Sequence, residues 1–230
     1  MTVGRTADAR FRLDTGTALM TLNNVLGLTL AGDGNVTRQA YLEETYEQAT
    51  IHSVGGGVSF TTIYQNTAFE TLATLAASNP NLESEFAIIC EPVPRSWQII
   101  PISWPRASYD APADDAITRP WSLMRRGIGW VGTSVAAFNA RSGVVRAFGG
   151  SSGEIGFIVI ESIASGITDI DFSGTDLAGV PANISRTGIF GPITKNNAAS
   201  RNLSITATGG SGNVRGYILT AGRREVVPSG

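Results

Sequence analysis

The chain has 230 residues, of which 42% are apolar and 16% are charged, and these proportions predict a folded protein rather than a disordered one. Its net charge of −2 gives no support to binding of nucleic acid or of an acidic membrane. With one cysteine the chain forms no internal disulfide, and with one histidine it has no polyhistidine metal site.

Short runs of β-branched and aromatic residues, separated by many of the 27 glycines, predict an all-β chain. Alternation in the segment VSFTTIY at 58–64 suits a sheet that is packed on one side only. In the first part of the chain the predicted strands are Phe11–Leu13, Ala18–Met20, Val25–Leu30, Ser59–Tyr64, Glu85–Cys90, Trp97–Trp104 and Pro120–Arg126.

Residues 31–57 are polar and predict a long irregular loop, which is uncommon inside a compact domain unless it is functional or disordered. Aromatic residues alternate there with acidic ones, and this mixture indicates a surface that folds against a partner. A solvated loop with a few packed aromatics fits the same residues. The residues of this candidate contact are Tyr41, Leu42, Glu43, Glu44, Tyr46, Glu47 and, near the end of the loop, His52.

One amphipathic α-helix is predicted at about 68–78. Thr67 is a suitable N-cap, and Glu70 completes a capping box three residues later. Phe69 and Leu72 begin an apolar stripe at helical spacing, which ends before Pro80. A single such helix in a β-protein is expected to cover the open face of a sheet or the end of a barrel.

A second set of strands begins after about residue 133 and predicts a small C-terminal β-sandwich. Glycine-rich separators at 149–153 and 209–212 fit hairpin turns. We therefore predict two domains, 1–138 and 139–230. The strands expected in the second are Val144–Phe148, Gly156–Glu161, Ile167–Phe172, Ile184–Ile189, Asn202–Thr208 and Val214–Ala221.

No set of residues indicates catalysis. His52 is the only histidine, so a surface or interface role is favoured over a catalytic one. Cys90 lies in an apolar strand and is expected to fill core space. The glycine runs lack the lysine and the strand–helix context of a phosphate-binding loop. The sequence therefore predicts no enzyme and no cofactor.

Aspartates gather at 110–115 and at 169–176. In the second group, Asp169, Asp171 and Asp176 are weak candidates for a hard cation such as Ca²⁺, but they lack the ligand spacing and closing Glu of an EF-hand. Aspartate also stabilises turns by accepting bonds from nearby backbone amides. Turn stabilisation is the favoured interpretation, and paired carboxylates in an acid–base mechanism are the least favoured.

The first domain resembles the major tail protein, or tail tube protein, of long-tailed (siphovirus-type) bacteriophages. The resemblance rests on the order of elements over roughly residues 10–132. The matching segments are GGGVSFTTIY, TAFETLATLAAS, EFAIICEPV, WQIIPISW and APADDAITRPWSLMRRGIGWVG. The chain departs from the pattern at four prolines around the Trp-containing strands, which restrict these strands to edges or bulges: Pro92, Pro94, Pro101 and Pro105.

This resemblance implies a β-sandwich or barrel with one flanking helix, whose subunits form six-membered rings that stack into a hollow tube. The loop at 31–57, from Tyr41 to His52, and the N-terminal arm at 1–10 would contact the next ring. Residues 139–230 would be an added Ig-like or carbohydrate-binding-like β-sandwich. Pairing of strands between subunits would remove exposed sheet edges.

The resemblance also implies partners and a location. The partners are further copies of the chain and other tail proteins: the tape measure, the tail terminator and the distal tail protein. Genomic DNA would pass through without specific binding. The net negative charge of residues 1–140, with nine arginines against thirteen acidic residues, agrees with this because it would repel phosphates. For the C-terminal domain two roles stay open: contact with a host-surface glycan, or a stabilising clamp between neighbouring subunits. The protein would be part of the virion, assembled in the host cytoplasm.

Two alternatives stay open. A capsid decoration (cement) protein would form trimers on capsids and would not stack on itself. A carbohydrate-binding, lectin-like module would stay small in solution and use tryptophans as a stacking platform. The candidates for that platform are Trp97, Trp104, Trp121 and Trp130.

Overall fold

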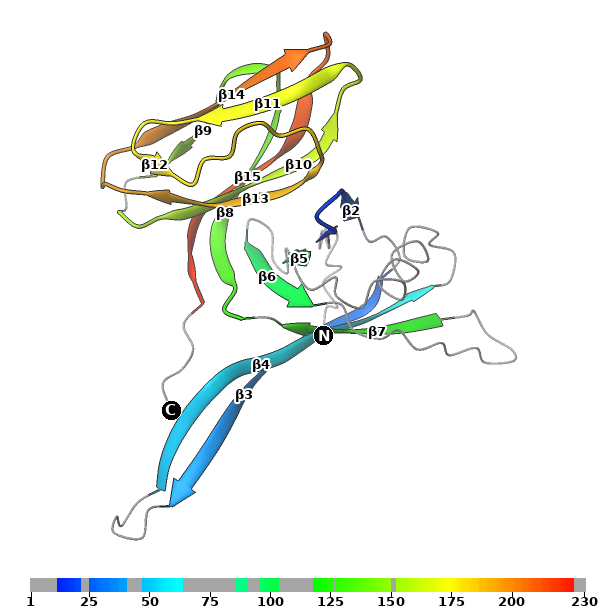
Figure 1. The fold of residues 1–230 in the computed structure, drawn as a ribbon, viewed down its shortest axis with the longest axis vertical. Helices are drawn as coiled ribbons and strands as arrows, with labels where there is room; N and C mark the ends of the chain where they lie inside the picture. The colour runs from blue at the N-terminus through cyan, green and yellow to red at the C-terminus, as the bar shows by residue number, and fades with distance from the viewer. Residues whose placement is uncertain are drawn as a thin grey trace, which may run out of the picture. The chain divides into compact units, whose positions relative to one another are not determined.

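The computed structural model describes residues 12–21, 25–40, 47–63, 86–90, 96–103, 118–125, 127–149 and 152–225. The chain divides into two compact units. The first unit is Met1–Thr21, Ala87–Ile99 and Trp130–Glu225, and the second is Leu22–Phe86, Ile100–Gly129 and Val226–Gly230. The regular elements of the described residues are all β-strands (Figure 1), as predicted. None of these residues belongs to a helix that is long and apolar enough to cross a membrane.

The strands of the first unit form two antiparallel sheets. Their bounds are β1 Arg12–Asp14, β2 Leu19–Thr21, β5 Phe86–Cys90 (residues 87–90 in this unit), β6 Trp97–Ser103 (residues 97–99 in this unit), β8 Trp130–Ala140, β9 Ser142–Phe148, β10 Ile155–Ile163, β11 Ile167–Ser173, β12 Leu177–Ala178, β13 Gly188–Lys195, β14 Arg201–Gly209 and β15 Val214–Arg224. One sheet has the order β12-β13-β10-β15-β8-β6-β5-β1-β2, and the other has the order β11-β14-β9.

The two sheets of the first unit pack face to face on one apolar core. Ile158 and Ile160 of β10 lie in the same buried cluster as Leu203 and Ile205 of β14. Burying each such side chain contributes about 1.5–3 kcal/mol. Every second residue of β14 from Leu203 to Ala207 is buried, as expected for a strand with one face on a core. This packing is consistent with a β-sandwich, whereas a separate C-terminal sandwich domain and its Ig-like or carbohydrate-binding-like character stay predictions.

A second buried cluster of the first unit is centred on Trp97. Its indole Nε1–H donates a hydrogen bond of 2.9 Å to the carbonyl oxygen of Thr220. Its ring meets that of Phe157 edge-on, with centroids 5.8 Å apart. Gly132 and Gly222 are paired across β8 and β15, and both lie directly beneath the indole. A Cβ atom at Gly132 would stand 2.3 Å from Trp97 Cε2, so only glycine fits there.

Strand β1 is fixed by a buried carboxylate. Asp14 is 3% exposed, and its Oδ2 accepts a hydrogen bond of 2.6 Å from the backbone amide of Ile189. Its Oδ1 accepts bonds from the Gly16 amide at 2.8 Å and from Arg186 Nη1 at 2.9 Å. Removing this carboxylate would leave the part-buried amides of Gly16 and Ile189 without their acceptor. This carboxylate therefore ties the chain near residue 14 to the segment near residue 189.

The only lysine of the chain is buried in the first unit. The side chain of Lys195 has no exposed surface, and its Nζ donates to the carbonyl oxygens of Gly149 and Ala199. Glu154 Oε2 lies 4.0 Å from the same nitrogen, while Glu154 Oε1 accepts a bond of 2.7 Å from the Ala221 amide. The charge is thus compensated inside the fold, as a buried ammonium requires.

An amine-reactive ester should leave Lys195 unmodified in the folded protein, because its Nζ is enclosed and engaged in hydrogen bonds. The same chain in guanidinium chloride serves as the control and should be modified at this residue. Peptide mapping by mass spectrometry measures both samples. Equal modification of Lys195 with and without denaturant would show that this part of the fold opens freely.

The strand predictions are largely confirmed after residue 130, with two corrections. Strand β8 was not predicted, and residues 138 and 139 both belong to it. The division into domains 1–138 and 139–230 stays a prediction. The strand predicted at Ile184–Ile189 is wrong: Ile184 makes only an isolated bridge to Ile170, and the strand is Gly188–Lys195. Ile184 is buried in the core without belonging to a strand, so its apolar character was misleading.

The second unit contains a long hairpin. Its strands are β3 Val25–Ala40, β4 Glu47–Ile63 and β7 Thr118–Arg125, together with residues 100–103 of β6. Figure 1 shows β3 and β4 as the long paired arrows in blue and cyan. The irregular loop predicted at 31–57 is therefore wrong for 31–40 and 47–57, which are strands, because backbone pairing needs no apolar alternation. The helix predicted at 68–78 lies outside the described residues.

Candidate assembly surface

The hairpin extends far beyond the sheet of the second unit. Strand β4 pairs with β7 from Gly57↔Met124 to Ile63↔Thr118. Between 47 and 56 its only described partner is β3, in a register that runs from Gly32↔Gly56 to Ala40↔Glu47. We call residues 32–40 and 47–56 the ribbon. At about 3.3 Å per residue, its nine-residue strand is about 30 Å long.

Both outer edges of the ribbon lack a partner among the described strands. Each edge carries a row of backbone N–H and C=O groups that can pair with another chain. A two-stranded hairpin alone is marginally stable in water, and most strands are only about five or six residues long. A ribbon of this length is therefore expected to be stabilised by a surface outside the unit.

Glycines concentrate where the ribbon leaves the sheet. Gly32 pairs with Gly56, and Asp33 with Gly55. Glycine weakens the interior of a strand, and it often marks a place where another backbone or a sharp twist must be accommodated. The composition at this point favours close approach of a second chain over the packing of side chains within the unit.

The candidate contact residues are only partly within the described structure. Tyr41, Leu42, Glu43, Glu44 and Tyr46 fall on 41–46, outside the described residues. Glu47 begins β4 opposite Ala40. His52 lies at a β-bulge, because Asn35 pairs with Ser53 and Val36 with Ile51, which leaves His52 without an opposite residue. A bulge increases the local twist of a ribbon, and a contact role for His52 stays a prediction.

Strand β7 ends at a half-buried arginine. The Nε–H of Arg125 donates a hydrogen bond of 2.7 Å to the carbonyl oxygen of Gly127. Desolvation by burial lowers the pKa of Arg125 from its ordinary value. A guanidinium still keeps its charge at neutral pH. This end of the second unit's sheet therefore carries a fixed positive charge.

The three candidate aspartates do not converge. Asp171 Oδ1 accepts a bond of 2.9 Å from the amide of Asn183, a residue with φ of 56°. Asp176 lies in a turn with φ of 59° and forms an ion pair of 2.5 Å with Arg201. The part of the chain that the structure describes contains no cluster of three His, Cys, Asp or Glu that could hold a metal ion. Asp171 and Asp176 thus have structural partners, which supports the interpretation as turn-stabilising residues.

Two of the four tryptophans proposed for the lectin platform pack within the first unit. Trp97 is 1% exposed and lies in the core. Trp130 is half-buried, and its ring meets that of Phe157 with centroids 5.2 Å apart. Trp104 lies outside the described residues, and only the backbone of Trp121, opposite Phe60, is described. At least two of the four candidate rings are therefore used for packing within the first unit.

No model of a known protein family matches the chain, and no curated protein matches it. A chain in the virion of the native gene transfer agent particle is 12% identical, with a TM-score of 0.43 over 54% of this chain and 95% of that chain. A chain in the tail of the empty particle, computed with C6 symmetry, is 11% identical, with a TM-score of 0.43 over 54% and 96%. The crystal structure of SPP1 Dit, a hub protein of the adsorption apparatus of phages that infect Gram-positive bacteria, is 10% identical, with a TM-score of 0.35 over 93% and 99%. At these scores no function is transferred to this chain.

Proposed function

We propose that this chain is the structural subunit of a phage tail tube, in which copies form six-membered rings that stack into a hollow tube. The observation that carries this proposal is the ribbon, whose two outer edges have no partner among the described strands. The sequence resemblance of roughly residues 10–132 to tail tube proteins supports it.

Strand pairing between copies accounts for the ribbon physically. A second copy supplies backbone donors and acceptors to the unpaired edges, which removes the risk of uncontrolled aggregation. Its apolar surface adds the burial that the ribbon cannot obtain alone. In a closed ring every copy both gives and receives the same contact, so no edge is left over.

The remaining parts of the proposal follow from this assembly. Residues 41–46, Glu47 and His52, carried at or beyond the far end of the ribbon, contact the next ring, together with the N-terminal arm. The lumen lets genomic DNA pass without binding it, because residues 1–140 are net acidic. Tape measure, terminator and distal tail proteins meet the tube at its ends. The protein belongs to the virion and is assembled in the host cytoplasm.

Negative-stain electron microscopy of the purified chain over a concentration series tests the proposal. We expect rings with six-fold symmetry at intermediate concentration and hollow tubes at high concentration, because assembly through unpaired edges follows mass action. Trimers that never stack would favour the capsid decoration protein. A chain that stays monomeric at the highest concentration and is retained on a polysaccharide column would favour the lectin-like module.

A further inference from the structure

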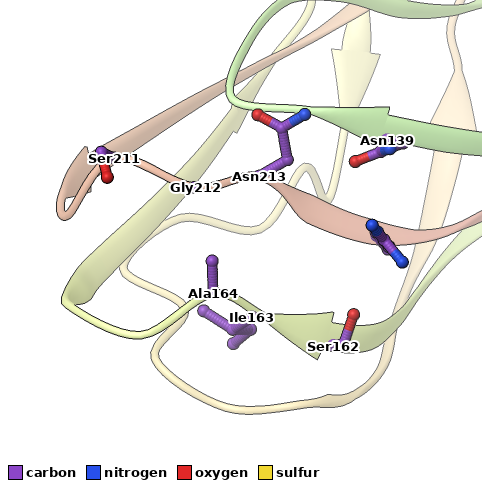
Figure 2. A pocket seen from close by; sticks show the side chains of 8 residues that line it. Asn139, Ser162, Ile163, Ala164, Ser211, Gly212 and Asn213 are labelled. Atoms are coloured by element: carbon purple, nitrogen blue, oxygen red, sulfur yellow. The ribbon is translucent and has the colours of Figure 1, made fainter.

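The first unit contains a hollow that neither the core nor the proposed tube contact uses. It has a volume of about 540 Å³, within the range of ligand pockets. Figure 2 shows Asn139, Ser162 and Asn213 around it, with Ala164 and Gly212 at the loop side; Arg215 completes this set. These residues come from the ends of β8 and β10, from the start of β15 and from the two loops beside them.

Three polar residues form a row across the outer face of the sheet. Arg215 of β15 pairs with Asn139 of β8 on one side and with Ser162 of β10 on the other. Directly opposed residues project to the same face of a sheet. All three are exposed, whereas the neighbours Phe138 and Val214 are buried in the core. The row therefore presents a guanidinium between an amide and a hydroxyl to solvent.

The charge of this hollow is uncompensated. Arg215 is the only charged residue among those that line it, and none of them is a carboxylate. No described residue forms an ion pair or hydrogen bond with its guanidinium. Glu161, next to Ser162 in sequence, is already paired with Arg12. The hollow thus offers a free two-pronged donor of the kind that fits a carboxylate or phosphate.

Hydrogen bonds hold the loops that form the wall of the hollow. The Ala164 amide donates to the carbonyl oxygen of Asn213 at 3.3 Å, and Arg141 Nη1 donates to that of Gly210 at 2.5 Å. A Cβ at Gly212 would come within 2.3 Å of Ala164 Cβ, so the two loops touch there. A site that is already formed loses little conformational entropy on binding.

We propose that this hollow binds a saccharide unit that carries one carboxylate or phosphate. Arg215 holds the acidic group, and the amides of Asn139 and Asn213 and the hydroxyl of Ser162 bond the neighbouring sugar hydroxyls. This proposal concerns a ligand of the first unit and does not depend on tube formation. If the saccharide site is wrong, the proposed tube assembly is unaffected, and the reverse also holds.

Isothermal titration of the full chain tests the site with three probes: a glucuronate-containing disaccharide, its glucose-containing counterpart and a glucose phosphate. We expect an acidic probe to bind at least about tenfold more tightly than the neutral one, because charge-assisted hydrogen bonds are the strong ones. Whichever acidic probe binds more tightly identifies carboxylate or phosphate as the natural group.

Matched variants of strand β15 assign the binding to Arg215. Arg215→Gln should weaken binding of the acidic probe at least about tenfold. The affinity of Arg215→Lys should lie between those of Arg215→Gln and the unmodified chain, since lysine keeps the charge but lacks the two-pronged guanidinium. Arg223→Gln removes the same charge from the same strand outside the hollow and should bind like the unmodified chain. Equal binding of neutral and acidic probes, no binding of either, or equal loss in both glutamine variants would overturn the proposal.

Discussion

Replacing residues 34–54 with Asn-Gly is expected to give a protein that folds but no longer forms rings or tubes. Asp33 and Gly55 are a register pair, so a two-residue turn can close the shortened hairpin at this point. The pairing of β4 with β7, between Gly57 and Ile63, is untouched. The unfolding midpoint of the shortened protein should therefore stay close to that of the full chain, while electron microscopy should show neither rings nor tubes.

A second variant separates backbone pairing from side-chain contacts. Glu43→Gln with Glu44→Gln keeps the length of the ribbon and both of its edges. We expect it to assemble, with a weaker dependence on salt, because charges at a rim affect salt dependence more than affinity.

Tubes formed by the protein with the shortened hairpin, with the same diameter as those of the full chain, would show that the ribbon takes no part in assembly.

The strands that bury both faces in the core could be predicted from the sequence. IGFIVIES is an apolar run of β-branched and aromatic residues, and it forms β10, with Phe157 to Ile160 buried. Strand β8 was missed because its residues are small where it passes beneath Trp97. Gly132 leaves room for the indole of Trp97, which lies 35 positions earlier in the chain, and it pairs with Gly222, which lies 90 positions later. Local patterns carry no trace of such distant constraints.

The ribbon and the hollow were missed for a related reason. The ribbon has no core to face, so its sequence lacks the alternation that marks a strand; the only local signals were the β-branched pairs Val36-Thr37 and Thr50-Ile51, which the structure places opposite each other. Arg215 looks like any surface arginine in the sequence. Its significance comes from the register that sets it between Asn139 and Ser162 and from the absence of a lining carboxylate.

Gly132→Ala is expected to lower the free energy of unfolding by about 3 kcal/mol, near the upper end of the range for overpacked cores. The new Cβ would stand 2.3 Å from Trp97 Cε2 and 2.4 Å from Cζ2. The indole cannot move aside easily, because it is bonded to the Thr220 carbonyl and packed against Phe157. Denaturant-induced unfolding, followed by tryptophan fluorescence or circular dichroism, measures the change.

A matched glycine and a double variant make this expectation specific to the indole. Gly149→Ala adds the same methyl group where its nearest neighbour would be Glu154 Oε2 at 3.5 Å, so the stability should change by no more than about 0.5 kcal/mol. Trp97→Phe removes atoms that clash with the new methyl group. The double variant Gly132→Ala, Trp97→Phe should therefore be more stable than the sum of the two single effects allows, by about 1 kcal/mol or more, as expected for residues in contact. Strictly additive effects would mean that the methyl group at Gly132 is accommodated elsewhere and that the indole does not lie on the glycine pair. A positive coupling would in turn explain why β8 has glycine at position 132, since the strand passes directly beneath Trp97 there.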